Sequence, residues 1–315
     1  MSAMRVVSLL PSATELLAAV GGIDLLVGRS HECDFPAGLD DVPMLTAQKT
    51  DPCATSAEID TQVRSVMQTA SDTQGDQQQP SLYTLDVDLL RDLKPDVILT
   101  QDLCDVCSID LNTVRGVAAQ LSPAPAVVSL NPTSVFDVFD DLLHVGDAIG
   151  RHDEAQVAMV DLRGRYWEAV DYVNPYLDGP EVVFIEWMDP LLVGGHWTPE
   201  LIAAAGGRHS INKAGERSRQ VNPEDVLEVM PDRLIICPCG YDLDAIDREL
   251  ATLTESKWWG LLPAVQDGCV ALIDGSAMFN RPGPRLVDAM CWLVGWFNDR
   301  PEIQPCDFPV RLLAE

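Results

Sequence analysis

"RVVSLLPSATELLAAVGG", residues 5–22, has a pattern of strand followed by helix that recurs along this chain. Its first residues, 5–10, are mostly apolar and predict a buried strand. The residues that follow predict a helix, with Ser12 as the N-cap, Glu15 three positions later to complete a capping box, and Gly21 at the end. A buried strand that leads directly into a helix is typical of α/β proteins.

Similar patterns recur along the chain and divide it into two halves. Short and almost continuous apolar runs predict further strands at 25–30, 96–101, 126–131, 181–187, 233–239 and 269–274. Runs of this kind suit parallel strands that are buried on both faces of a sheet. Helical patterns lie around 56–68, between 134 and 177, and at 284–298. The polar run 70–80 predicts a loop.

These patterns predict an α/β protein with two Rossmann-like lobes, each with a parallel sheet, joined by a single long α-helix. We expect an N-terminal lobe over residues 4–133, linker helices over 134–178 and a C-terminal lobe over 179–315. The longest helical pattern in the linker covers roughly 20 residues, which corresponds to about 30 Å.

The composition narrows the classes of partner. The 315 residues carry a formal net charge of −28, which repels nucleic acids and anionic membranes. No run reaches the roughly 18 apolar residues of a membrane span. Residues 1–22 lack the apolar core of an export signal, so we expect a cytoplasmic protein whose cysteines are mostly reduced. We also expect a monomer. A lysine-poor acidic surface fits either a halophilic protein or ordinary acidic solubility.

Unusual side chains gather where the predicted strands end. In open parallel sheets, ligands bind outside the carboxyl ends of the strands, and a cleft between two such lobes would be lined from both sides. The candidate pocket residues at these ends are His31, Glu32, Phe35, Gln101, Glu186, Trp187, His196, Trp197, Tyr241, Phe279 and Arg281. Trp187 and Trp197 suit stacking on a flat ligand, although burial in the core is the alternative.

The motif "CDVC", residues 104–107, leaves three interpretations open. Cys104 and Cys107 could form a redox pair, although a redox motif opens a helix and this one follows a strand. They could hold a transition metal such as zinc or iron together with His31 and Cys33, or with Cys237 and Cys239. They could also pack as small apolar side chains.

Motifs for catalysis are missing from the sequence. It contains no phosphate loop of the GKS/T type, no GxGxxG fingerprint and no GxSxG elbow. We therefore expect a binding protein rather than an enzyme.

Several segments together carry a resemblance to a known family. They are "RVVSLLPSATELLAAVG", "VGRSHECDFP", "LKPDVILTQ", "AAAGG", "VNPEDVLEVMPDRLIICPCG" and "RPGPRLVDA". With the long linker helix, they resemble the cobalamin-binding, periplasmic-type substrate-binding proteins of class III, and in particular a subgroup that lacks an export signal. The resemblance spans roughly residues 4–298.

The resemblance implies a corrinoid ligand between two lobes bridged by a rigid helix. By position, the ligand contacts would fall on His31, Phe35, Trp187, Trp197, Phe279 and Arg281. It also implies docking to an ABC permease through one acidic residue on each lobe, here Asp88 and Glu224. Two alternatives to a corrinoid binder or carrier stay open: a protein that binds a metal or iron chelate through a Cys/His site, and a thiol-dependent enzyme that acts on such a chelate.

Overall fold

The computed structural model describes residues 3–49, 55–72, 82–102 and 109–313. The chain divides into two compact units, which we describe separately. Unit 1 contains Met1–Ala54, Glu58–Pro132 and Phe136–Asp161, and unit 2 contains Thr55–Ala57, Thr133–Val135 and Leu162–Glu315. None of the described helices is long and apolar enough to cross a membrane.

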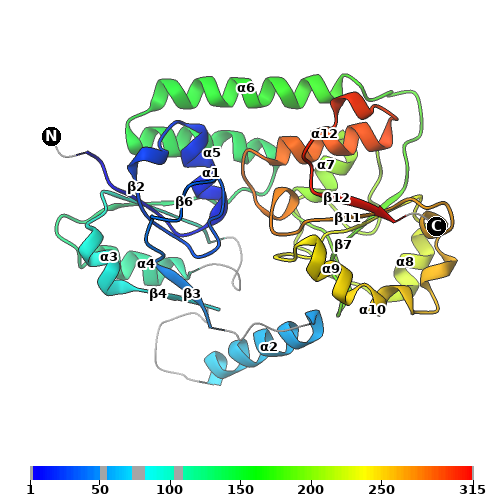
Figure 1. Cartoon of the computed structure of the whole chain (residues 1–315), viewed down its shortest axis with the longest axis horizontal. Helices are drawn as coiled ribbons and strands as arrows, with labels where there is room; N and C mark the ends of the chain where they lie inside the picture. The colour runs from blue at the N-terminus through cyan, green and yellow to red at the C-terminus, as the bar shows by residue number, and fades with distance from the viewer. Residues whose placement is uncertain (1–2, 50–54, 73–81, 103–108, 314–315) are drawn as a thin grey trace. The chain divides into compact units, whose positions relative to one another are not determined.

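Unit 1 is built on a four-stranded parallel sheet with the order β2-β1-β5-β6. Its strands are β1 (Val6–Ser8), β2 (Leu26–Arg29), β5 (Val97–Thr100) and β6 (Ala126–Ser129). Helices α1 (Pro11–Ala19) and α5 (Val135–Ile149) lie on one face of the sheet, and α3 (Val87–Leu93) and α4 (Leu111–Ala118) lie on the other (Figure 1). All four strands were predicted from their apolar runs, one or two residues too long at their ends.

A second, two-stranded sheet in unit 1 was not predicted. Strand β3 (Thr46–Gln48) pairs antiparallel with β4 (Tyr83–Leu85), with Thr46 opposite Leu85 and Gln48 opposite Tyr83. The chain between them includes helix α2 (Ser56–Asp72). The backbone N–H of Leu45 donates to the carbonyl of Arg29 at 2.8 Å, which ties the start of β3 to the end of β2.

Unit 2 contains a six-stranded mixed sheet with the order β12-β11-β10-β7-β8-β9. The three predicted strands, β7 (Val182–Trp187), β10 (Arg233–Ile236) and β11 (Val270–Ile273), are parallel to one another. Three antiparallel strands were not predicted: β8 (Leu192–Val193), β9 (Arg219–Gln220) and β12 (Val310–Leu313).

Helices cover both faces of the sheet in unit 2. Helices α7 (Thr198–Ala204) and α12 (Leu286–Phe297) lie on one face, and α8 (Pro223–Val229) and α9 (Leu243–Glu249) lie on the other (Figure 1). Shorter pieces complete the unit: α10 (Ala251–Thr254), η2 (Trp259–Leu261), α11 (Pro263–Gln266), η3 (Met278–Asn280) and η4 (Pro301–Ile303). The predicted α/β fold class is confirmed.

The long predicted helix is α6 (His152–Val170), with 19 residues. The boundary between the two units falls inside it, after Asp161, so α6 begins in unit 1 and ends in unit 2.

The first helix of the chain corrects one prediction. It begins at Pro11, with Leu10 at the N-cap and no side-chain cap, so the predicted capping box at Ser12 is wrong.

Proline explains the shifted start of α1, because its ring fixes a helical φ and its missing N–H is not needed in the first turn. The side chains of Ser12 and Glu15 are buried instead. The predicted end is confirmed, since Gly21 follows the helix with a φ of +71°, where glycine carries no steric penalty.

Candidate functional site

A polar cluster lies at the carboxyl end of β2 in unit 1. His31 and Glu32 follow the strand directly, and the ring Nδ1 of His31 lies 2.6 Å from Oγ1 of Thr46 in β3. The backbone N–H of His31 donates to the same oxygen at 3.0 Å, and Oγ of Ser30 lies 3.0 Å from it. Thr46 is buried, so it anchors both the backbone and the ring of His31.

Tyr83 of β4 completes this cluster. Its hydroxyl donates to Oε1 of Glu32 at 2.8 Å, and its ring meets the His31 ring edge-on with 5.1 Å between the centroids. His31 and Glu32 were predicted from the sequence, whereas Thr46 and Tyr83 were not. The alternation in "YTL", residues 83–85, was the available signal, but three residues are too few for a reliable strand prediction.

Burial sets the charge of His31. Desolvation lowers the pKa of the imidazole, and the neighbouring carboxylate of Glu32 opposes this shift without cancelling it. The ring is therefore neutral at neutral pH, and a neutral imidazole can serve as a metal ligand.

Cys33, two residues further along, packs into the interior of unit 1. Its side chain is 2% exposed, and its Sγ accepts a hydrogen bond from Oγ1 of Thr14 at 3.0 Å. Cys104 and Cys107 lie outside the described residues. Within the described ranges, no three His, Cys, Asp or Glu side chains come together to hold a metal ion, and the predicted Cys/His metal site stays a prediction.

The other predicted residues of unit 1 lie at strand ends as expected. Phe35 is 43% exposed in the loop after β2, and Gln101 is half-buried at the end of β5. The exposed ring of Phe35 and the neutral imidazole of His31, four residues apart in the sequence, offer an apolar and a polar contact for a ligand.

In unit 2, the end of β7 carries a carboxylate and an aromatic ring. Oγ of Ser218 lies 2.8 Å from both carboxylate oxygens of Glu186, which holds this side chain in place. The indole N–H of Trp187 donates to the carbonyl of Asp189 at 3.1 Å, and its ring packs edge-on against Tyr241 with 5.5 Å between centroids. Glu186 and Trp187 are both half-buried.

His196 lies in a tight turn after β8. Its φ is +53°, and its backbone N–H donates to the carbonyl of Glu216 at 2.6 Å. The preceding residue must be glycine, because a Cβ on Gly195 would lie 2.5 Å from backbone atoms of residues 216–218. Burial lowers the pKa of His196, and the positive charge of Arg217 lowers it further.

Three predicted ligand contacts are buried in unit 2 instead: Trp197, Phe279 and Tyr241, which is 7% exposed. Phe279 is 0% exposed and packs against Phe184, and Trp197 is 6% exposed, with its indole N–H donating to the carbonyl of Phe279 at 2.7 Å. A ligand cannot touch Phe279, whose side chain is fully enclosed by protein, and Trp197 and Tyr241 leave it little accessible surface. These residues support the site, while the half-buried Arg281 that follows η3 is accessible.

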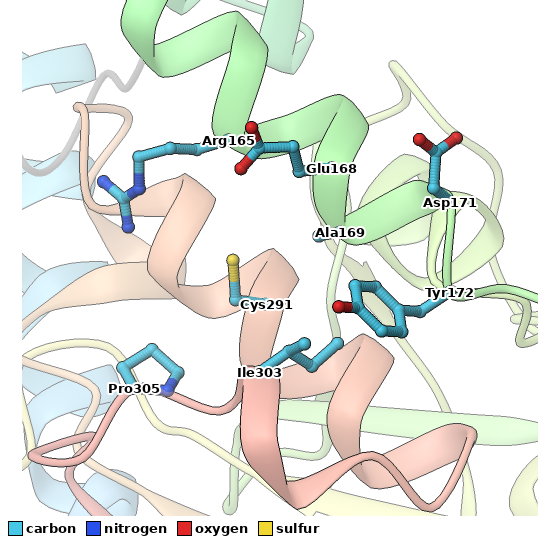
Figure 2. A pocket seen from close by; sticks show the side chains of 8 residues that line it. All are labelled: Arg165, Glu168, Ala169, Asp171, Tyr172, Cys291, Ile303 and Pro305. Carbon is cyan, nitrogen blue, oxygen red and sulfur yellow. The ribbon is translucent and has the colours of Figure 1, made fainter.

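Two cavities in unit 2 lie apart from the predicted residues. One of about 600 Å³ lies between α6, α12 and η4. Figure 2 shows Cys291 of α12 facing Arg165 and Glu168 of α6 across this space. Burial raises the pKa of the Cys291 thiol, which keeps it protonated. The other cavity, of about 450 Å³, is lined by Glu181, Ser210, Ile211, Arg219, Asp225, Glu228 and Val229.

The two predicted docking residues occupy matching positions. Asp88 is the second residue of α3, with a side chain 92% exposed, and Glu224 is the exposed second residue of α8. The carboxylate of Asp88 pairs with Arg91 at 2.9 Å. Both acidic groups lie in the first turn of a helix, where the helix dipole favours negative charge.

Comparisons with known proteins agree with this fold. A family model described as "Periplasmic binding protein" matches residues 6–277. The periplasmic vitamin B12 binding protein BtuF of Vibrio cholerae superposes with a TM-score of 0.66 at 19% identity, covering 93% of this chain and 96% of that one. No curated protein sequence matches the chain.

Other similar structures have a different ligand in their names. A periplasmic heme binding protein from Pseudomonas aeruginosa has a TM-score of 0.71 at 20% identity, covering 99% of this chain and 98% of that one. The periplasmic heme-binding protein RhuT from Roseiflexus sp. has a TM-score of 0.67 at 20% identity, covering 95% and 99%. At these identities the likeness establishes the fold alone.

Proposed function

The chain belongs to the periplasmic binding protein family, whose members bind solutes rather than transform them, and we propose that its ligand is a corrinoid. The protein would serve as the substrate-binding component of an ABC importer. The resemblance of its strand-end segments to cobalamin-binding proteins supports this ligand, as does its likeness to a solved vitamin B12 binding protein.

One observation carries the proposal: each unit holds polar and aromatic side chains in fixed positions at the carboxyl ends of its parallel strands. In unit 1 these are His31 and Glu32, with Phe35 exposed in the same loop after β2. In unit 2 they are Glu186 and Trp187, each restrained by a hydrogen bond. A corrin has a broad apolar face and a rim of amide groups, and such a ligand needs aromatic surface and hydrogen-bonding groups together.

Heme or another iron chelate is the second candidate. Proteins named for heme binding have the same fold, and a neutral imidazole suits iron as well as cobalt. The decisive experiment is a calorimetric and spectroscopic titration of the purified protein with aquocobalamin, cobinamide and hemin in parallel. Micromolar or tighter binding of a corrinoid, with hemin weaker, is the expected result. Preference for hemin would replace the first candidate by the second.

Trp187 offers a direct test of the site in unit 2. If its ring lies against the ligand, Trp187→Ala should weaken corrinoid binding by about 2 kcal/mol, roughly 30-fold in Kd. Trp258→Ala is the matched control, since Trp258 is also half-buried in unit 2 but lies outside the predicted set. Equal affinities of the two variants, measured by calorimetry, would contradict the assignment.

A permease is the partner that this function requires. We propose that Asp88 and Glu224 dock it through salt bridges to basic residues. The double variant Asp88→Arg/Glu224→Arg should keep corrinoid affinity but lose ligand transfer to a permease in reconstituted vesicles. Unchanged transfer by the double variant would favour a carrier that acts without a permease.

A further inference from the structure

The hydrogen bonds around Thr46 prepare His31 for a particular role. A threonine hydroxyl can accept two hydrogen bonds and donate one. Thr46 Oγ1 already accepts from the backbone N–H of His31 at 3.0 Å. One lone pair and one proton remain for its two other neighbours, Nδ1 of His31 at 2.6 Å and Oγ of Ser30 at 3.0 Å.

This arrangement can hold a proton on Nδ1. When Nδ1 carries the proton, it donates to the remaining lone pair of Thr46, and the threonine proton turns to Oγ of Ser30. The lone pair of the imidazole then lies on Nε2. Histidines that bind metals are commonly fixed in this way, with the second ring nitrogen bonded to a protein oxygen that sets the tautomer and the ring orientation.

The second nitrogen of the His31 ring, Nε2, is available to bind a ligand. Tyr83 restrains the ring by its edge-on contact at 5.1 Å, and its hydroxyl is engaged by Glu32 rather than by the imidazole. Among the residues that the structure describes, Nε2 of His31 has no hydrogen-bond partner. An imidazole whose Nδ1 is hydrogen-bonded and whose Nε2 has no partner can bind a metal that has one free coordination position.

We propose that Nε2 of His31 is the axial ligand to the metal of the bound chelate, with Thr46 as the residue that positions it. The inference rests on the proposed function and adds a bond that the proposed function does not need. A macrocycle supplies the four equatorial ligands, so one axial nitrogen from the protein is sufficient.

The binding step is a ligand exchange without electron transfer. An aquo-corrinoid enters with water on cobalt(III), the cobalt–oxygen bond breaks, and water leaves with its electron pair. The lone pair of Nε2 forms the cobalt–nitrogen bond, while the ring proton stays on Nδ1 and bonds to Thr46. Charge and atoms balance, and no oxidant or reductant is required.

Electron paramagnetic resonance of the cobalt(II) form tests the bond directly. Cobinamide is the probe, because it has no nucleotide base that could supply a nitrogen of its own. An axial nitrogen splits each cobalt line into a triplet, and histidine labelled with the heavy nitrogen isotope should turn the triplets into doublets. Cobalt lines without nitrogen splitting in the wild-type complex would overturn the inference.

Variants assign the nitrogen to His31. His31→Ala should abolish the splitting and weaken cobinamide binding by about tenfold or more, whereas His152→Ala, at an exposed histidine of α6, should change neither. Persistence of the splitting in a folded His31→Ala protein would overturn the assignment. Thr46→Val should weaken binding by about 10–100-fold, and Thr46→Ser should restore it, because only the hydroxyl fixes the tautomer.

The same experiment separates this inference from the proposed function. If cobinamide binds at micromolar concentration but shows no nitrogen splitting, the function stands and the axial bond is refuted. If hemin binds in place of the corrinoid, the absorption spectrum of the histidine-ligated heme should be lost in His31→Ala, and an unchanged spectrum in that variant would refute the inference. Failure of both chelates to bind would overturn the function and the inference together.

Discussion

Asp141 is a residue whose charge works against the fold. This carboxylate of α5 is 5% exposed, and its Oδ2 has no hydrogen-bond partner among the described atoms. Burial raises the pKa of Asp141 to about 6, although the hydrogen bond from His144 partly counteracts the shift. Between about pH 4 and 6 the folded state thus holds more protons than the unfolded state, and stability falls as the pH rises through this range.

Asp141→Asn should therefore stabilise the protein at neutral pH by about 1–3 kcal/mol. Asparagine cannot ionise, and its oxygen can still pair with His144. The advantage over wild type should vanish below about pH 4, where the carboxyl is neutral in both states. Urea unfolding across this pH range measures it, with Asp140→Asn as the exposed neighbouring control. An advantage that does not change with pH would contradict this account.

The candidate site shows how far prediction from sequence extends to single residues. His31, Glu186 and Trp187 could be predicted, because the carboxyl ends of parallel strands are where ligand contacts gather. Thr46 and Tyr83 could not, because their strands are three residues long and pair across more than thirty residues of intervening chain. Phe279 and Trp197 look like ligand contacts in the sequence, but burial depends on packing that no local pattern contains.

At the scale of elements, the segment from α3 to β5 has a close counterpart from α8 to β10. Both helices end in a residue with positive φ, 45° at Lys94 and 49° at Met230, and a proline follows each. The aspartate after each proline accepts a hydrogen bond at 2.8 Å from the backbone N–H of the residue just before a neighbouring strand. Asp96 accepts from Arg5, before β1, and Asp232 accepts from Glu181, before β7. The two "PD" turns thus attach the end of α3 to β1 and the end of α8 to β7 by the same hydrogen bond.

The N-cap of α3 should contribute measurably to stability. The carboxylate of Asp86 accepts a hydrogen bond from the backbone N–H of Leu89 at 2.9 Å. Asp86→Ala leaves this N–H without its partner and should cost about 1 kcal/mol. Chemical denaturation measures the loss. Asp92→Ala, at an exposed position near the end of the same helix, removes the same charge without a cap and should cost clearly less.

At the scale of the whole molecule, strand and helix patterns were sufficient for the α/β class because buried parallel strands are continuous apolar runs. Strand β8 and the two edge strands β9 and β12 escaped prediction because they are short or half-exposed and carry no such run. The predicted linker helix is present as α6, and the division into units falls within it, which an apolar pattern alone does not indicate.

The net charge of −28 makes a prediction for the molecule as a whole. Like charges repel across a compact surface, and folding brings them closer together than they are in the unfolded chain. Salt shortens the screening length from about 10 Å at 0.1 M to about 3 Å at 1 M. The melting temperature should therefore rise with potassium chloride, with most of the rise completed by about 1 M, where screening of neighbouring charges is nearly full.

Sodium sulfate separates this effect from general salting-out. Sulfate strengthens apolar burial in any protein, and its effect continues to grow with concentration. If charge repulsion dominates, the two salts should give similar melting temperatures at equal ionic strength in the low range and diverge only at high concentration. A melting temperature that stays constant in potassium chloride up to 1 M would show that the acidic surface serves solubility alone, because repulsion relieved by screening must appear as stability.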